Sequence, residues 1–226
     1  MVSLVLVVLA AAPHQAQLSE ALALEKSGRD GLALERLEAL SVLDPTWETS
    51  RMELARLRLK LGADAERAGW HADIARSLSP ENPRAHYLFA LAEDEAGRAE
   101  SAIRALEVAL TLRAEFPDAR LRLATILSAQ RRWREAVAQW RLYLATAPTA
   151  TGARLQLALA LDRAGELKAA ERELRALSKL DAVRVVATRR LIDLLEHSHR
   201  ASEAAALRRS LEVPGRVLRP LKPSGR

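Results

Sequence analysis

The chain has 226 residues, a net charge of +6 and no cysteine, and 49% of its residues are hydrophobic. Without cysteine, disulfides, thiolate metal sites, a cysteine nucleophile and the acylated cysteine of a lipoprotein are all excluded. Aromatic residues make up only 4% of the chain, which suits packing between Ala- and Leu-rich helices better than a β-sandwich.

The positive charge is concentrated at the C-terminal end of the chain. Residues 1–183 carry 25 basic and 25 acidic side chains, whereas residues 184–226 carry ten basic and four acidic ones. A repeat protein that reads nucleic acid along its body needs a basic stripe along the repeats. The neutral body therefore argues against nucleic acid as the main partner.

An apolar run, VSLVLVVLAAA, occupies residues 2–12. Eleven residues at about 1.5 Å each cannot cross a hydrocarbon core of about 30 Å. The length of the run and the small residues at its end are typical of a signal peptide, although no Lys or Arg precedes it. We therefore expect residues 1–13 to be a signal peptide and the protein to be exported to the periplasm. The alternative is a hydrophobic N-terminal strand or cap, packed on the next segment of a cytoplasmic protein.

A repeat of about 34 residues follows this run. The stretch from Pro117 to Pro148 predicts two amphipathic helices, with apolar residues at helical spacing on either side of Arg131. Moving this frame along the chain finds similar turns at regular intervals of 34 or 35 residues, at Gly28, Gly62, Gly97, Arg131, Gly165 and His199. A fixed period of this length indicates stacked helical hairpins.

Within each period, residue types recur at fixed places. A Leu or Phe followed by Ala stands in the first helix (Leu54–Ala55, Phe89–Ala90, Leu123–Ala124, Leu157–Ala158), and an Ala stands early in the second helix (Ala33, Ala68, Ala102, Ala136, Ala170). Proline ends four of the periods, at Pro45, Pro80, Pro117 and Pro148. In this pattern residues 14–212 resemble the tetratricopeptide repeat family. The resemblance implies an all-α fold, a right-handed superhelical solenoid of about six antiparallel helix hairpins.

Elementary physics explains the recurring types. Two helices cross closely at Ala102, Ala136 and Ala170, where a longer side chain would overpack the contact at about 1–3 kcal/mol. Glycine at the turn supplies the left-handed residue that ends the first helix. Each buried Leu or Trp contributes a few kcal/mol only when the next hairpin covers it, so a single repeat should be unstable alone.

The resemblance also implies a binding groove, because the first helix of each hairpin lines the concave surface in this family and binds segments of partner proteins. The family's groove positions correspond in this chain to Leu18, Leu22, Met52, Arg56, Leu59, Tyr87, Leu91, Leu121, Thr125, Leu155, Leu159, Arg189 and Asp193. An exposed apolar strip of this length marks an interaction surface. The alternative is that tight curvature closes the groove and makes these residues part of the core.

The partner should be held by apolar contacts. Family members that bind chaperones hold a C-terminal carboxylate with paired Lys and Asn side chains, and this chain has a single Asn, Asn82, in a Ser-Pro-Glu-Asn-Pro turn. We therefore expect a protein-interaction scaffold that binds an apolar or amphipathic segment of a partner protein.

The sequence carries no signature of catalysis or of a cofactor. It contains no GxSxG, GxxxxGK[ST], GxGxxG or HExxH motif. His197 and His199 would point about 200° apart on a helix rather than toward a common ion. We expect no catalytic residue, no cofactor and no metal site.

The last period departs from the pattern. Polar or charged residues replace apolar ones, as expected of a solvated cap on a repeat array. Beyond it, residues 213–226 (VPGRVLRPLKPSGR) contain three prolines, two glycines and no acidic residue, and we expect a flexible basic tail. A weak contact of this tail with an anionic surface, either lipid headgroups or nucleic acid, is an alternative function.

Overall fold

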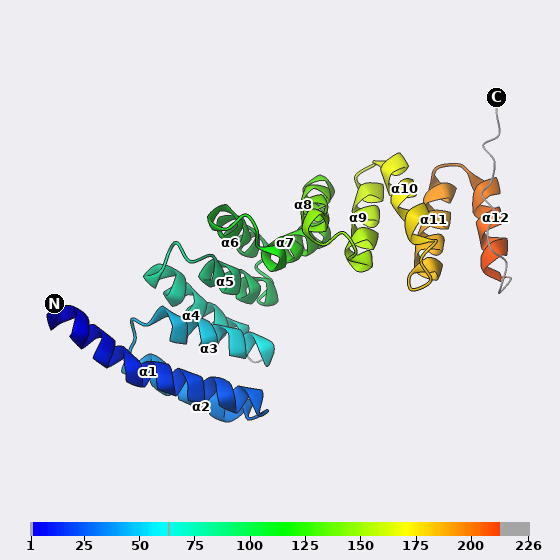
Figure 1. The fold of residues 1–226 in the computed structure, drawn as a ribbon. Helices are drawn as coiled ribbons and strands as arrows, with labels where there is room; N and C mark the ends of the chain where they lie inside the picture. Colours follow the sequence, from blue (N-terminus) through cyan, green and yellow to red (C-terminus); the bar gives the residue numbers. More distant parts are fainter. Residues whose placement is uncertain (1, 63, 213–226) are drawn as a thin grey trace. The chain divides into compact units, whose positions relative to one another are not determined.

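The computed structural model describes residues 2–62 and 64–212, with side chains from residue 14 to residue 211. The described residues form helices joined by short turns and contain no strand (Figure 1). The helices are α1 (Val2–Lys26), α2 (Asp30–Leu43), α3 (Glu48–Lys60), α4 (Ala65–Leu78), α5 (Pro83–Glu95), α6 (Ala99–Leu112), α7 (Pro117–Ala129), α8 (Trp133–Thr146), α9 (Thr151–Arg163), α10 (Leu167–Leu177), α11 (Arg184–His197) and α12 (Ala201–Glu212).

The chain divides into two compact units. Unit 1 ends at Ile126 and unit 2 begins at Leu127, so the boundary falls within α7. In unit 1, α1 pairs with α2, α3 with α4 and α5 with α6; in unit 2, α9 pairs with α10 and α11 with α12. These hairpins confirm the predicted all-α repeat fold.

The turns between paired helices share one backbone geometry. All six predicted turn residues have positive φ, including Arg131 at 59° and His199 at 60°. At Gly97 the amide N–H donates to the carbonyl of Asp94 at 3.0 Å, and the next N–H, of Arg98, donates to the carbonyl of Glu93 at 2.8 Å. This pair of bonds closes the first helix and satisfies two of its last carbonyls. The same pair recurs at Gly28, Arg131, Gly165 and His199.

The core is built between neighbouring hairpins. One buried cluster joins α1 and α2 to α3 and consists of Leu18, Ala21, Ala33, Leu37, Leu40, Leu54 and Leu57. A second cluster joins α3 and α4 to α5 and consists of Met52, Ala55, Ala72, Ala75, Ala85 and Leu88. In both clusters the first helix of the following hairpin completes the core of the one before it, as expected of a repeat array.

The predicted close-packing alanines are fully buried. Ala102, Ala136 and Ala170 each have 0% exposure. Pro117 occupies the start of α7, where its missing N–H breaks no helical hydrogen bond. Pro83, which the repeat pattern did not include, begins α5 in the same way, and the Asn82 side chain accepts a hydrogen bond from the Arg84 N–H at 3.0 Å.

The structure describes the backbone of the apolar N-terminal run and the charged residues of the last hairpin. The backbone of residues 2–12 is helical and continuous with the rest of α1, not a strand. In the part of the chain that the structure describes, no helix combines the length and apolarity needed to span a membrane. At the other end, the charged residues predicted to form a solvated cap are exposed: Arg189, Arg190, Asp193, Glu196, Arg208 and Arg209. The predicted basic tail lies outside the described residues.

Candidate partner-binding cleft

Unit 1 contains a solvent-open cleft of about 550 Å³ that is lined by first helices of three successive hairpins. Its lining residues come from α3, α5 and α7: Arg56, Leu59, Lys60, Tyr87, Leu88, Leu91, Glu95, Asp118, Leu121, Arg122 and Thr125. Helical spacing explains this selection, because Tyr87 and Leu91, and likewise Leu121 and Thr125, are four residues apart and share one helix face.

The apolar part of the cleft consists of leucines and one aromatic residue, Tyr87. Leu59, Leu91 and Leu121 are partly buried, so each keeps some apolar surface available in the cleft. The Tyr87 ring packs against the buried Phe116, with 4.9 Å between ring centroids. Burial raises the pKa of the Tyr87 phenol, with a smaller contribution from Asp118. Its hydroxyl is therefore protonated at neutral pH and can donate a hydrogen bond.

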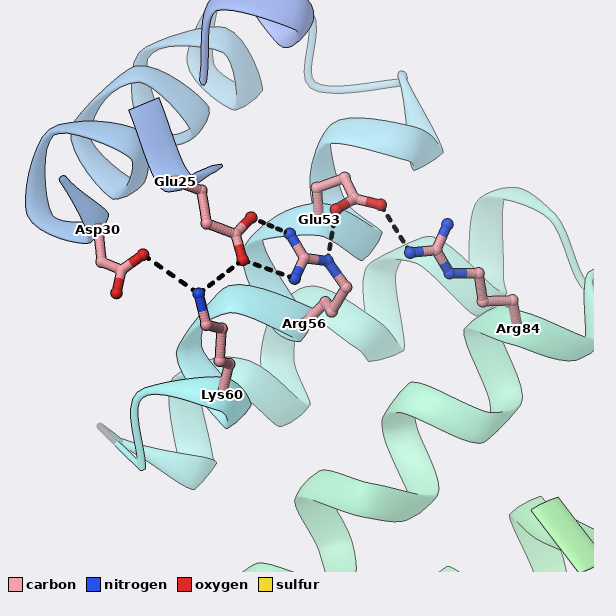
Figure 2. A network of polar contacts seen from close by, with 6 residues as sticks. All are labelled: Glu25, Asp30, Glu53, Arg56, Lys60 and Arg84. Atoms are coloured by element: carbon pink, nitrogen blue, oxygen red, sulfur yellow. Dashed lines mark hydrogen bonds and ion pairs between the residues drawn. The ribbon is translucent and has the colours of Figure 1, made fainter. Parts of the chain in front are cut away.

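Two basic residues of the cleft lining, Arg56 and Lys60, belong to an ion-pair network (Figure 2). The Arg56 guanidinium donates to Glu25 Oε1 at 3.0 Å and to Glu53 Oε2 at 2.6 Å. Lys60 donates to Glu25 at 3.0 Å and to Asp30 at 3.3 Å, and Arg84 donates to Glu53 at 2.6 Å. The network therefore ties α1, α2, α3 and α5 together across two hairpin boundaries.

The network holds its members in their charged forms. The hydrogen bond from Arg56 lowers the pKa of Glu25 from 4.5 to about 2. The same hydrogen bond raises the pKa of the Arg56 guanidinium above its ordinary value. Arg56 and Lys60 each face carboxylates within unit 1, so these two cations of the cleft are already neutralised.

Three consecutive acids at the end of α5, Glu93, Asp94 and Glu95, have three different surroundings. Glu93 is buried and accepts from Arg98 at 2.6 Å, and Asp94 pairs with Arg122 at 2.7 Å. Glu95 lies in the cleft. The hydrogen bond from Arg98 lowers the pKa of Glu93. The three cations of the cleft, Arg56, Lys60 and Arg122, thus all face carboxylates.

The two acidic residues of the cleft lack such partners. Both Glu95 and Asp118 are exposed, and neither forms an ion pair with any residue that the structure describes. The cleft therefore combines an apolar strip with two carboxylates available for binding. This arrangement can bind an apolar segment that carries positive charge.

The structure brings six of the thirteen predicted groove residues to the cleft: Arg56, Leu59, Tyr87, Leu91, Leu121 and Thr125. Leu18 and Met52 are only 5% exposed. Leu18 belongs to the buried cluster of α1–α3 and Met52 to that of α3–α5, so neither is available in a groove. Leu22 is 38% exposed and lies outside the cleft lining.

The remaining predicted residues belong to unit 2. Leu155 and Leu159 are partly buried on α9, and Arg189 and Asp193 are exposed on α11. Sequence reasoning missed five cleft residues: Lys60, Leu88, Glu95, Asp118 and Arg122. Asp118 and Arg122 could have been found, because they are separated by four residues and flank Leu121 on the same face of α7.

Two of the histidines contact oxygen atoms of the protein. The His197 Nε2 lies 2.9 Å from the Asp162 carboxylate, and the His86 Nε2 lies 2.8 Å from the Pro80 carbonyl. Within the described part of the chain, no group of three or more His, Asp or Glu side chains is arranged to hold a metal ion.

Comparisons with known proteins agree with this architecture. Residues 93–139 match the family model described as tetratricopeptide repeat. No curated protein matches the sequence.

Solved structures resemble the chain over most of its length. MamA is 16% identical, with a TM-score of 0.68 over 76% of this chain and 93% of that protein. YrrB, described as a TPR protein with an unusual peptide-binding site, is 19% identical, with a TM-score of 0.68 over 76% of this chain and 88% of its own. A tetratricopeptide repeat protein from Parabacteroides merdae is 17% identical, with a TM-score of 0.69 over 88% and 78% of the two chains.

Proposed function

We propose that this chain, whose fold is that of tetratricopeptide-repeat proteins, is a non-enzymatic scaffold whose unit 1 cleft binds a segment of a partner protein. The segment is amphipathic, with apolar side chains that cover the leucines of the cleft and a Lys or Arg that pairs with Glu95 or Asp118. The observation that carries this proposal is the cleft itself, where Leu91 and Leu121 stand beside two carboxylates that have no cationic partner among the described residues.

Two physical arguments support an amphipathic, basic partner. Covering partly exposed leucines removes apolar surface from water at about 25 cal/mol per Å². Charge complementarity then selects among apolar segments, because an acidic segment would meet Glu95 and Asp118 with like charge. Binding also requires no rearrangement of Arg56, Lys60 or Arg122, whose ion pairs are already formed.

The proposal is tested with the full chain as bait. Leu91→Asp and Leu121→Asp place a charge in the apolar strip and should release the captured partner. Val108→Asp is the matched control, since Val108 is 42% exposed on α6 and lies outside the cleft. Circular dichroism should show equal helix content in all three variants. Capture that survives both cleft substitutions, or that is lost equally with Val108→Asp, contradicts the proposal.

Export is a separate part of the proposal and rests on the sequence of residues 1–13, an apolar run that ends in small residues. Cleavage in this region would leave a mature chain that begins at the first repeat. Sequencing the N-terminus of protein recovered from its native cells decides the question. A mature protein that still begins at Met1 rules out processing and leaves the cytoplasmic adaptor.

A further inference from the structure

The two compact units carry opposite net charges. Residues 1–126 contain 15 basic and 19 acidic side chains, a net charge of −4. Residues 127–211, the part of unit 2 whose side chains the structure describes, contain 16 basic and nine acidic ones, a net charge of +7. Attraction of anions is therefore concentrated in unit 2.

The carboxylates of unit 2 already have partners within the unit. Each of the nine acidic side chains of residues 127–211 pairs with an Arg or His side chain at a distance between 2.6 and 3.7 Å. Five exposed cations on or beside the second helices of the hairpins form no ion pair with any described residue: Arg134, Lys168, Arg172, Lys179 and Arg209. These five charges are available to a ligand.

Four exposed cations follow one line along α10. Lys168, Arg172 and Arg175 are separated by four and three residues, so they share one face of the helix. Lys179 comes four residues later, in the turn that follows α10. Of the four, only Arg175 has carboxylate partners. The line therefore presents three uncompensated positive charges.

The neighbouring second helices extend this line. Arg134 and Arg141 of α8 precede Lys168 and Arg175 by one period of 34 residues, and Arg209 of α12 follows Arg175 by one period. Ion pairs join the three helices, because Arg141 donates to the Glu that precedes α10 at 2.8 Å and Arg175 donates to a Glu of α12 at 3.4 Å. We call this surface the basic stripe, and it consists of Arg134, Arg141, Lys168, Arg172, Arg175, Lys179 and Arg209.

Exposed leucines border the basic stripe. Leu142, Leu167 and Leu180 are 50%, 36% and 40% exposed, and each is adjacent in sequence to a cation of the stripe. Single-stranded nucleic acids are bound by stacking on aromatic side chains, and no aromatic side chain of residues 127–211 is exposed. A membrane that contains anionic lipids matches both features, because it offers charged headgroups to the cations and an apolar boundary to the leucines.

We propose that the basic stripe of unit 2 binds the surface of a membrane that contains anionic lipids. The cations contact the headgroups, and Leu142, Leu167 and Leu180 enter the boundary between headgroups and acyl chains. This site shares no residue with the unit 1 cleft and adds a second function to the proposed one. The scaffold would then hold its protein partner at a membrane surface.

Cosedimentation of the full chain with vesicles tests the cations. Vesicles of phosphatidylcholine and phosphatidylglycerol in a ratio of about 2:1 should bind the protein, and vesicles of phosphatidylcholine alone should not. The triple variant Lys168→Gln, Arg172→Gln, Lys179→Gln should bind about a hundredfold more weakly, because each cation near an anionic surface contributes a factor of about five. Its fold should be unchanged, since all three side chains are exposed and unpaired within the described residues.

A matched control makes the same change of charge in unit 1. Lys26, Arg29 and Arg104 are exposed and form no ion pair with a described residue, so the variant Lys26→Gln, Arg29→Gln, Arg104→Gln should bind vesicles like the unmodified protein. Both triple variants keep residues 213–226, and the difference between them therefore reports the basic stripe alone. No binding to the anionic vesicles, or an equal loss in the two variants, overturns the inference.

A leucine substitution separates a membrane from other anionic ligands. Leu142→Gln should weaken vesicle binding about fivefold, because it removes apolar surface that leaves water on binding. Val108→Gln is the control, since Val108 is 42% exposed on α6 of unit 1. Vesicle binding that Leu142→Gln leaves unchanged overturns the inference, and duplex DNA or polyglutamate bound through the three stripe cations would then be the class of ligand instead. Leu91→Asp in the cleft should release the partner without changing vesicle binding, so the two proposals can fail separately.

Discussion

At the scale of single residues, two of the turns adopt a left-handed backbone conformation without the glycine that usually occupies such a position. Arg131 and His199 adopt the left-handed conformation that glycine adopts at Gly28, Gly62, Gly97 and Gly165. A side chain in this region clashes with its own backbone at about 1–2 kcal/mol. The repeat keeps the conformation because the two hydrogen bonds that close the helix depend on it.

Glycine at these two turns should therefore stabilise the protein. Arg131→Gly and His199→Gly are each expected to raise the free energy of unfolding by about 0.5–1 kcal/mol, the relief of strain being partly offset by the greater freedom of an unfolded glycine. The reverse change, Gly97→Ala, should lower it by about 1 kcal/mol. An added Cβ at Gly97 meets no atom within 4 Å, so this loss reports backbone strain alone. Urea unfolding measures all three, and destabilisation by Arg131→Gly would contradict the argument.

A second residue, His71, links stability to pH. It is 6% exposed, and its Nδ1 lies 3.4 Å from the Arg51 guanidinium. Burial, together with the charges of Arg51, Arg58 and Arg67, lowers its pKa from 6.5 to about 4. Between these values the unfolded chain binds the proton and the folded chain does not. Stability is therefore full above pH 6.5 and falls as the pH is lowered toward 4.

The loss through His71 should amount to about 3 kcal/mol, because each pKa unit corresponds to about 1.36 kcal/mol. His71→Gln keeps a polar group beside Arg51 but does not titrate, so it should flatten the pH dependence of the unfolding free energy between pH 6.5 and 4. Below pH 4.5 the variant should still lose stability through Glu25, whose pKa is lowered to about 2. An unchanged slope above pH 4.5 in the variant would count against His71 as the source.

At the scale of helices, α3 buries three charged side chains, whereas α5 buries one, Glu93. Arg51, Glu53 and Arg58 are each less than 9% exposed. Glu53 pairs with Arg56 and Arg84, and Arg58 pairs with Glu38 of α2. The charges of α3 therefore join its hairpin to the hairpins on either side. Such a network specifies how the helices align, but it makes the removal of one partner costly.

Removal of Arg56 tests this dependence. Arg56→Met keeps most of the apolar stem but leaves Glu25 and Glu53, whose side chains are 13% and 8% exposed, without their shared cation. We expect a loss of about 3 kcal/mol in the free energy of unfolding and an upward shift of the Glu25 pKa in a carboxylate titration by NMR. Arg36→Met is the control, because its pair with Glu20 is 59% and 52% exposed and should contribute about 0–1 kcal/mol. Equal effects of the two substitutions would refute the network as a stabilising feature.

At the scale of the whole molecule, stability is the sum of hairpins and the contacts between neighbours. The clusters on α1–α3 and α3–α5 are buried only because the next hairpin covers them. Damage within one unit should therefore stay near its origin. The proposed cleft benefits from this arrangement, since three successive first helices hold its lining in place.

Hydrogen exchange should show this locality. Leu37 and Leu174 are fully buried in α2 and α10, and truncation of either to Ala should cost about 3 kcal/mol. Leu37→Ala should reduce amide protection in α1–α3 and leave α9–α11 unchanged, and Leu174→Ala should do the opposite. Equal loss of protection in both units after either substitution would mean that the protein unfolds as a single unit.

The sequence by itself determined the repeat, its turns and the close-packing alanines, because these depend on local conformation and on spacing along one helix. For example, a left-handed turn requires a residue such as Gly97, and a close helix crossing requires a small residue such as Ala102, each at a fixed place in the repeat. Only the tertiary structure decided which polar and apolar side chains are available to bind a partner. In it Met52 is buried, Arg56 forms an ion pair with Glu25, and Glu95 has no ion-pair partner among the described residues. The physical reason is that burial and ion pairing in a first helix depend on the side chains of the hairpins beside it, which lie about 30 residues away in the sequence and are not fixed by the period.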